Sequence, residues 1–279
     1  MVESLLINDT GGSTFWSDQG ITTPTRNDYV YHIEFNHVHN FGHGILSDYG
    51  AIKTGTKYDC DYAPYDDFQK NCHAYTHVYN NLLHDGKSYF VGANMIYSDC
   101  SSSRNTFENN IIYGDGEYAM KHHCGVDNVS KNNIVHRTPG AHAMHGMLGA
   151  CEVNQPNRFQ TISNYNNIYL FEDVVDLHLA KKGHRFDNGN SPAFHQNIYW
   201  SRIGGLDTAL FPGNLNWTDW SQLGNDVNSV WTDPKLVNPS PGQYVLAPDS
   251  PALAMGIKQI QLDNFGIEKN VSLFFKKTK

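Results

Sequence analysis

Glu108-Asn109-Asn110-Ile111-Ile112-Tyr113 is the clearest copy of a phrase that recurs along this chain: an Asn, an apolar residue, a Tyr or His, and then a turn. The other copies are Glu34-Phe35-Asn36-His37-Val38-His39, Tyr79-Asn80-Asn81-Leu82-Leu83-His84, Lys131-Asn132-Asn133-Ile134-Val135-His136, Tyr165-Asn166-Asn167-Ile168-Tyr169 and His195-Gln196-Asn197-Ile198-Tyr199. The marker residues of these copies are Asn36, Asn81, Asn110, Asn133, Asn167 and Asn197, and the successive intervals between them are 45, 29, 23, 34 and 30. Such self-similarity predicts a solenoid of stacked repeats.

The repeating unit is built from strands. Helical repeats would place apolar residues at i, i+3, i+4 and i+7. This chain instead has short alternating runs rich in Val, Ile and Tyr, bounded by Gly, Asn and Asp, which is typical of strands. The sequence therefore predicts an all-β parallel β-helix, a single-chain solenoid. A propeller has longer repeats, and a β-sandwich lacks an Asn-anchored phrase.

The marker Asn has two expected roles. Asn tolerates the left-handed backbone conformation, so it suits the tight bend that follows each strand. Its amide can also hydrogen-bond to the equivalent Asn of the next coil, as in other stacked ladders. We expect both in every coil.

The domain organisation follows from the repeats. We expect β-helix coils over residues 1–240, with an inserted loop at 53–75, and a terminal strand with a capping tail over 241–279. A solenoid needs such a cap to cover its last edge. No comparable cap is evident at the front, which leaves open that the chain is the C-terminal part of a longer protein.

Composition limits the partners. The formal net charge of -8 argues against nucleic acid, which needs a basic surface. No apolar run approaches the length of a membrane span. Aromatic residues make up 13% of the chain, enough to supply sugar-stacking surfaces. We therefore expect a polysaccharide or glycan as the partner, and neither a nucleic acid nor a membrane span.

Cysteines and glycosylation motifs favour an extracellular or secreted protein. The cysteines are Cys60 and Cys72 around one loop, Cys100 and Cys124 one repeat apart, and Cys151. N-glycosylation motifs begin at Asn8, Asn128, Asn216 and Asn270. The start of the chain, from Met1 to Asp9, lacks the basic end and apolar stretch of a signal peptide.

The loop at 53–75 makes the first interval longer than the others. Long loops on solenoids project from one face and often carry binding residues. Tyr58, Tyr62 and Tyr65 lie here among acidic residues. They are candidates for stacking on sugar rings, and the alternative is that they pack on the protein's own scaffold.

A polar ladder is expected on one flank of the solenoid. With the preceding marker Asn as position i, Asp48, His122 and His145 each occupy position i+12. By the same count His178 occupies i+11 and Asp99 occupies i+18. Because parallel strands are about 4.8 Å apart, these side chains, or His123 in place of His122, should stack in a row.

Asp48 and Asp99 are the catalytic candidates. They lie 51 residues apart, about one coil once the inserted loop is subtracted. Carboxylates on adjacent coils would be about 5 Å apart, as in retaining glycosidases, and their mutual repulsion would raise one pKa. The alternative is that each Asp ends a strand by bonding backbone amides.

Three phrases resemble family 141 of the glycoside hydrolases, which are right-handed parallel β-helix proteins of the pectin-lyase-like fold. They are Ser47-Asp48-Tyr49-Gly50-Ala51-Ile52, Ile96-Tyr97-Ser98-Asp99-Cys100-Ser101-Ser102 and His123-Cys124-Gly125-Val126-Asp127-Asn128. The resemblance implies a retaining hydrolase that uses Asp48 and Asp99, with His123 near the substrate hydroxyls. The chain departs from the family at Cys100 and Ser101, where the family has an acid and a Gly.

The substrate-binding residues that we expect are Tyr49, His122, His123, His145, His178, Tyr58, Tyr62 and Tyr65. A polysaccharide lyase on the same fold is one alternative, with Arg104 or Lys121 near the ladder as base. A non-catalytic glycan-binding or structural β-helix is another. Histidines in a row could also bind a transition metal, but they lack a set ligand geometry. We therefore expect neither a metal nor a cofactor.

Overall fold

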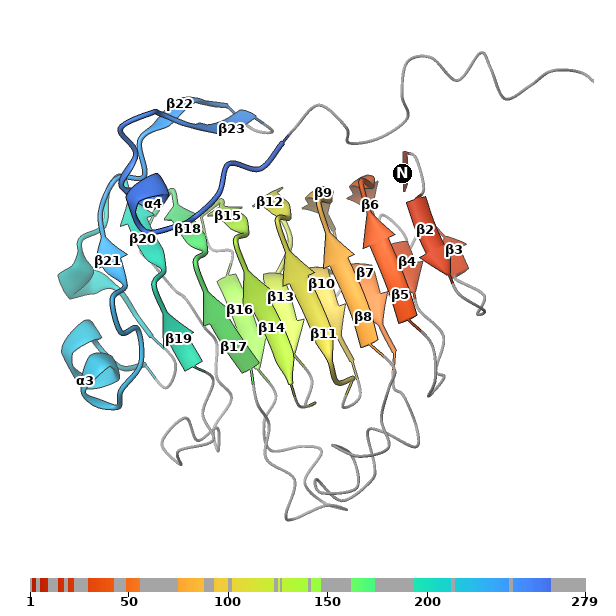
Figure 1. Cartoon of the computed structure of the whole chain (residues 1–279), viewed down its shortest axis with the longest axis horizontal. Coiled ribbons are helices and arrows are strands. Elements are labelled where there is room, and N and C mark those ends of the chain that lie inside the picture. Colours follow the sequence, from red (N-terminus) through yellow and green to blue (C-terminus); the bar gives the residue numbers. More distant parts are fainter. Residues whose placement is uncertain are drawn as a thin grey trace, which may run out of the picture.

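The computed structural model describes residues 2–3, 6–9, 15–17, 20–22, 30–42, 49–55, 75–87, 93–99, 102–122, 125, 127–139, 142–146, 162–173, 193–211, 214–240 and 243–261. Within these ranges the chain is all-β, with a few short helices near its C-terminal end. Successive strands stand side by side along the long axis of the molecule, in chain order (Figure 1). The expected all-β class, with parallel strands in stacked sheets, is confirmed.

Three long sheets contain most of the strands. The eight-stranded sheet consists of β1 (Val2–Glu3), β6 (His37–Phe41), β9 (Leu82–Gly86), β12 (Ile111–Gly114), β15 (Ile134–Arg137), β18 (Ile168–Phe171), β20 (Ile198–Ser201) and β21 (Val230–Trp231). The seven-stranded sheet consists of β2 (Leu6–Asp9), β5 (Val30–Glu34), β8 (Tyr75–Tyr79), β11 (Asn105–Glu108), β14 (Asn128–Lys131), β17 (Ile162–Tyr165) and β19 (Ala193–His195). The six-stranded sheet consists of β3 (Phe15–Ser17), β4 (Gly20–Thr22), β7 (Tyr49–Thr54), β10 (Ala93–Ser98), β13 (Tyr118–His122) and β16 (His142–Gly146).

The chain visits the three sheets in the same order in successive repeats. From β5 to β16 it passes from the seven-stranded to the eight-stranded and then to the six-stranded sheet, four times over. From β7 to β15 each strand pairs in parallel with the strands one repeat before and one repeat after it, as β12 does with β9 and β15. Each repeat therefore contacts only its neighbours, as a one-dimensional stack does.

The first edge of the stack is covered, which differs from the expectation for the front of the chain. β1 pairs antiparallel with β6, and β2 pairs antiparallel with β5. β3 and β4 form an antiparallel pair beside β7. Short strands running against the direction of the stack satisfy edges that would otherwise pair with another chain.

The marker asparagines form the predicted amide ladder. Each Nδ2 donates to the Oδ1 of the next marker, over 2.9 Å from Asn36 to Asn81 and 2.9 Å from Asn81 to Asn110. The ladder continues through Asn133 and Asn167, with Nδ2 to Oδ1 distances of 3.0 Å from Asn110 and 3.0 Å from Asn133. All these side chains are fully buried, so the ladder supplies partners that water cannot.

The left-handed residue is not the marker itself but the residue before it. Asn80, Asn109, Asn132 and Asn166 have φ values of 53°, 56°, 52° and 56°. This residue turns the chain out of the seven-stranded sheet, and the marker Asn then leads directly into the eight-stranded sheet. The two roles that we expected of one Asn are thus divided between two consecutive residues.

The interior of the stack is mostly apolar. Its eight-stranded wall contributes the buried residues Val38, Leu83, Ile112, Val135, Tyr169 and Tyr199. Val78, Phe107 and Phe194 face them from the seven-stranded sheet, and Ile52, Ile96 and Met120 from the six-stranded sheet. Because all of these side chains are nearly inaccessible to solvent, each stabilises the stack by about 1.5–3 kcal/mol relative to an exposed position.

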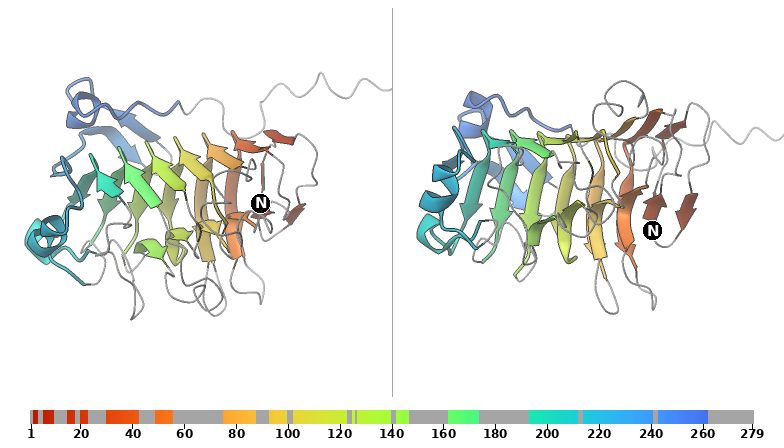
Figure 2. Two further views of the ribbon diagram at one scale, coloured as in Figure 1. Left: turned by 60° about the horizontal axis from the view of Figure 1, so that its bottom comes forward. Right: turned by 90° about the horizontal axis from the view of Figure 1, so that it is seen from below.

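The C-terminal segment covers the outer face of the eight-stranded sheet. β22 (Leu236–Ser240) and β23 (Gln243–Leu246) form an antiparallel hairpin, followed by α4 (Pro251–Ala254). Tyr244, Leu246 and Ala252 pack on the outward row that includes Ile134 and Ile168. The hairpin and α4 lie over the blue-green end of the stack in each view (Figure 2).

A buried carboxylate organises the last turn of the stack. The short 3-10 helix η2 (Leu206–Thr208) and α3 (Trp217–Gln222) lie in this part of the chain, and Asn216 caps the N-terminus of α3. Asp226 accepts hydrogen bonds from Trp220 Nε1 at 2.6 Å and from Tyr199 Oη at 2.9 Å. Burial raises the pKa of Asp226 above its usual range, against the effect of these hydrogen bonds.

The fold bears on two features noted in the sequence, the membrane span and the glycosylation motifs. No helix in the described ranges is both long enough and apolar enough to span a bilayer. Asn128, which begins one of the glycosylation motifs, is fully buried, and its Nδ2 donates to Ser102 O at 3.0 Å. In the folded chain its amide is therefore part of the interior, whereas Asn216 is exposed.

Candidate functional site

A row of polar and aromatic residues runs across the outer face of the six-stranded sheet. The register places Lys53 of β7 opposite Tyr97 of β10, and Tyr97 opposite Lys121 of β13. His145 of β16 continues the row, next to Lys121. Neighbouring residues in a strand point to opposite faces, so this row faces away from the interior that contains Met120.

Asp99 lies beside this row, two residues beyond Tyr97 along the chain, and is ion-paired. It directly follows β10, and its backbone N–H donates to Thr54 O at 3.1 Å. Its carboxylate Oδ2 lies 2.8 Å from Lys53 Nζ. The exposed fraction of the side chain is 14% for Asp99 and 25% for Lys53, so the pair is shielded from water but still reachable.

Tyr97 holds the two lysines together. Lys53 Nζ lies 4.7 Å and Lys121 Nζ 4.4 Å from the centre of the Tyr97 ring. Both distances fall within the range of cation–π attraction. Tyr97 itself is buried and Lys121 nearly so, so two ammonium groups and one carboxylate are fixed around one aromatic ring. We call Lys53, Tyr97, Asp99 and Lys121 the lysine–aspartate cluster.

The register differs from the predicted polar ladder. Tyr49 lies opposite Ala93, and Thr54 lies opposite Ser98. His122 lies opposite Ser98 rather than Asp99, and His145 lies opposite Lys121 rather than His122. Asp48 itself lies outside the described residues.

Tyr49 and His122 are buried, which differs from the expectation that they line an open surface. The Tyr49 hydroxyl donates to Gly42 O at 2.9 Å, and its ring packs against Phe41. His122 is fully buried, pairs in register with Ser98 and packs on the Phe107 ring. Burial lowers the pKa of His122 to about 4, so the ring is neutral at pH 7. The shift of one residue relative to Lys121 turns it to the interior face.

The remaining candidates cannot be placed as side chains. His123, His178, Tyr58, Tyr62 and Tyr65 lie outside the described residues, as do the five cysteines. His145 is described only as backbone, in register with Lys121. The predictions for these residues stay predictions.

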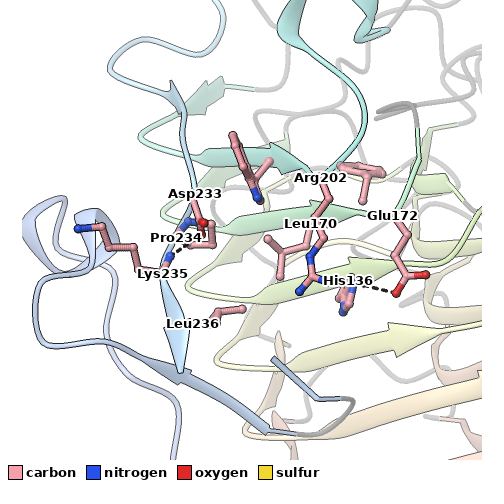
Figure 3. Close-up of a pocket in the computed structure, with 10 residues that line it drawn as sticks. His136, Leu170, Glu172, Arg202, Asp233, Pro234, Lys235 and Leu236 are labelled. Carbon is pink, nitrogen blue, oxygen red and sulfur yellow. Dashed lines mark hydrogen bonds and ion pairs between the residues drawn. The ribbon is translucent and has the colours of Figure 1, made fainter. Parts of the chain in front are cut away.

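A small cavity lies beneath the C-terminal segment, on the other long face of the molecule. It has a volume of about 120 Å³ and is lined by His136, Leu170, Phe171, Glu172, Trp200, Arg202, Asp233, Pro234, Lys235 and Leu236 (Figure 3). His136 Nε2 lies 3.3 Å from Glu172 Oε1 at one wall. Burial lowers the pKa of His136, and the Glu172 carboxylate opposes this effect. Ligand pockets commonly have volumes of about 300–1,000 Å³. This cavity is smaller, as expected for a gap left between the sheet and the C-terminal segment that packs on it.

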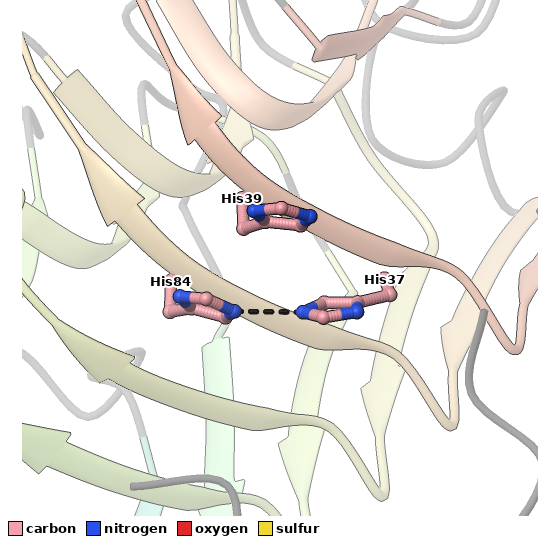
Figure 4. Close-up of side chains that lie close together, drawn as sticks. All are labelled: His37, His39 and His84. Atoms are coloured by element: carbon pink, nitrogen blue, oxygen red, sulfur yellow. Dashed lines mark hydrogen bonds between the residues drawn. The ribbon is translucent and has the colours of Figure 1, made fainter. Parts of the chain in front are cut away.

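Three histidines could hold a metal ion. His37 and His39 of β6 and His84 of β9 bring ring nitrogens to within 4.8 Å of one another. They lie on the outer face of the eight-stranded sheet, beyond the end covered by the C-terminal hairpin (Figures 1 and 4). They were not selected from the sequence, although each lies one or three residues after a marker Asn.

Comparisons with protein-family models, with curated proteins and with solved structures found no match to this chain.

Lys53 and Tyr97 were also missed as site residues. The sequence pattern singles out acids and histidines, and Lys53 falls at the start of the expected loop at 53–75. A signal was nevertheless present, because Tyr97 lies two residues before Asp99 and so points to the same side of the strand. The partner strand could not be aligned from spacing alone, so the ion pair became visible only in the structure.

Proposed function

We propose that this chain is a right-handed parallel β-helix protein that binds and cleaves a complex polysaccharide at the lysine–aspartate cluster, with Asp99 as the acid/base candidate. The observation that supports this most is the ion pair of Asp99 with Lys53 beside the Tyr97 ring. It places a partly accessible carboxylate and two fixed cations on the outer face of a parallel sheet. The extracellular location belongs to the same proposal, because complex polysaccharides are found there.

Hydrolysis is the reaction that the sequence resemblance implies, and Asp99 is the residue that would carry it. A retaining glycosidase needs a second carboxyl group about 5–5.5 Å away, and an inverting one about 6.5–9.5 Å away. Asp48, the second carboxyl group that the sequence resemblance implies, lies outside the described residues. In this proposal Asp48 remains the partner of Asp99.

Elimination at an acidic polysaccharide is the second candidate, and the two lysines favour it. In this reaction a base removes the proton beside a uronate carboxylate, and the bond to the leaving sugar oxygen breaks to give an unsaturated product. A cation next to the carboxylate stabilises the negative charge that develops. Lys53 and Lys121, on either side of Tyr97, offer two such cations.

The test is turnover on a panel of neutral and uronate-containing polysaccharides. New reducing ends are measured alongside the absorbance of an unsaturated product. Reducing ends without that absorbance would show hydrolysis, and both signals together would show elimination. Binding without turnover would refute cleavage and leave a glycan-binding scaffold.

Asp99→Asn and Glu108→Gln make a matched pair of variants. Glu108 is also an ion-paired acid on a parallel strand, 3.1 Å from Lys131 Nζ, but it lies on the seven-stranded sheet. Asp99→Asn should lower turnover by about 10²-fold or more, the usual contribution of a general acid or base. Glu108→Gln should leave turnover unchanged. Equal activity of the two variants would refute the assignment of Asp99.

A further inference from the structure

The outer face of the eight-stranded sheet carries a row of rings at the same position of successive strands. His39 lies opposite His84, His84 opposite Tyr113, and Tyr113 opposite His136. Tyr113 stacks on His84, with ring centroids 4.4 Å apart, and Tyr244 of the C-terminal hairpin lies next to Tyr113. Tyr244 thus lies against Tyr113 in the middle of the row, and His84 and His39 precede Tyr113 in the stack.

His37 adds a third imidazole at this end of the row. It lies two residues before His39 on β6, so both side chains point to the same face of the sheet. Its ring centroid is 4.4 Å from that of His39 and 4.9 Å from that of His84. His37 and His39 are half-buried, and His84 is buried. Three nitrogen ligands thus converge at a place that solvent can still reach.

The hydrogen-bond contacts of the cluster indicate which ring nitrogens face one another. His84 Nδ1 lies 2.7 Å from Asp85 Oδ2, so Nδ1 carries a proton and donates it to the carboxylate. The lone pair of His84 is then on Nε2, which lies 2.7 Å from His37 Nε2. A proton on His37 Nε2 must fill that contact. Figure 4 shows these two rings edge to edge, joined by this bond, with His39 over them.

We propose that His37, His39 and His84 form a binding site for a divalent transition metal such as Zn²⁺, which replaces the shared proton. Imidazole nitrogen is a preferred ligand of Zn²⁺. Metal-binding histidines commonly donate their second ring N–H to a carboxylate, as His84 does to Asp85. This hydrogen bond fixes the tautomer of the ring and raises the basicity of the nitrogen that binds the metal. Three histidines leave one tetrahedral position open for water or a substrate oxygen.

The site must adjust in two ways to take the ion. Two nitrogens bound to one tetrahedral Zn²⁺ are about 3.3 Å apart, so His37 Nε2 and His84 Nε2 move apart by about 0.6 Å. The His39 ring is parallel to the His84 ring within 10°. Because a ring nitrogen's lone pair lies in the ring plane, His39 turns about its Cβ–Cγ bond to reach the ion.

Asn40 can support the turned His39. Its Nδ2 lies 3.0 Å from His39 Nδ1. When His39 Nε2 binds the metal, Nδ1 carries the proton, and the Asn40 amide presents its oxygen instead of its nitrogen. An amide makes this exchange by a half turn. His37 likewise carries its proton on Nδ1 when its Nε2 binds the metal, so all three imidazoles act as neutral ligands and no net proton is released.

The experiment is a Zn²⁺ titration of the whole chain, with a chromophoric chelator as competitor. We expect one high-affinity ion per chain. Asp85→Asn should weaken binding by about 10- to 100-fold, because it removes only the outer carboxylate. Asn tolerates the left-handed φ of 55° that Asp85 has, so this variant should keep its fold. His84→Asn should weaken binding more than Asp85→Asn does.

His195→Asn is the matched control. His195 stacks on Tyr165 at the opposite end of the molecule, and its loss should leave Zn²⁺ affinity unchanged. Far-UV circular dichroism and metal-free unfolding midpoints report whether each variant is folded. Equal affinity of the His84→Asn variant and the control would overturn the proposal.

The Co²⁺ spectrum provides a second readout that does not depend on folding of variants. Histidine ligands give a tetrahedral Co²⁺ spectrum without the sulfur-to-metal charge-transfer band that a thiolate adds. A strong band of that kind in the wild-type chain would place the ion on the cysteines and refute the histidine site.

Discussion

Replacing Asn133 with Ala tests whether the amide ladder stabilises the stack. Asn133 Nδ2 donates to Asn167 Oδ1 at 3.0 Å, to Phe107 O at 2.9 Å and to Ser130 Oγ at 3.2 Å. Asn133 Oδ1 accepts from Asn110 N at 2.9 Å and from Asn110 Nδ2 at 3.0 Å. The side chain is fully buried, so water cannot replace these partners.

The cost follows from the donors that the variant leaves behind. In Asn133→Ala the backbone N–H of Asn110 and one of its two Nδ2 protons lose their acceptor, whereas the other still reaches Val78 O. An unsatisfied buried donor costs about 1–3 kcal/mol. With two such donors, we expect the free energy of unfolding to fall by about 2–6 kcal/mol.

Asn166→Gly is the control for this measurement. Asn166 has a φ of 56°, and its Oδ1 accepts no hydrogen bond in the described structure. Gly adopts positive φ without strain, so its cost should stay within about 1 kcal/mol. Urea unfolding followed by circular dichroism and by tryptophan fluorescence gives both values. A loss in Asn133→Ala no larger than that in Asn166→Gly would refute the argument.

Two further predictions concern buried ionisable groups. The pKa of His122 is lowered to about 4 by burial, so its contribution is full above pH 6.5 and is lost as pH falls through 4; this amounts to about 3 kcal/mol. His122→Leu should flatten that part of the stability profile, and an unchanged profile would contradict the burial of a neutral ring. The pKa of Asp226 is raised by burial, so its contribution is present below its ordinary value and declines as pH rises through the raised one. Asp226→Asn should remove this decline in a pH series of unfolding midpoints, and a decline that persists would show that another group causes it.

The sequence was sufficient to predict the repeating unit, because the chemistry of the corner is local. An Asn followed by alternating apolar residues can be recognised without knowing its partners, and the bonds from Asn81 to Asn110 are those that the pattern indicates. The identity of the left-handed residue was not predictable in the same way. Both residues of the pair Asn109-Asn110 tolerate positive φ, and only the bond to the next repeat decides which of them enters the ladder.

The register of the six-stranded sheet could not be predicted, because the connection between the second and third strand of each repeat varies in length. Gly50 and Asn94 are paired, and with their markers Asn36 and Asn81 as position i they occupy i+14 and i+13. Tyr118, the partner of Asn94, occupies only i+8 relative to Asn110. A single offset from the marker therefore compares positions that do not lie side by side: Ala93 and His122 both occupy i+12, but His122 lies opposite Ser98.

Alignment by the marker is reliable only within the strand that the marker begins. His39, His84, Tyr113 and His136 all lie three residues after their markers, and all four fall in one row of the eight-stranded sheet. No connection of variable length intervenes, so the spacing in the sequence is the spacing in space. Asp99 lies beyond such a connection, whereas His39 and His84 lie in strands that directly follow their markers. The histidine cluster is therefore the site that this sequence could have indicated, and the lysine–aspartate cluster is one that only the strand pairing could show.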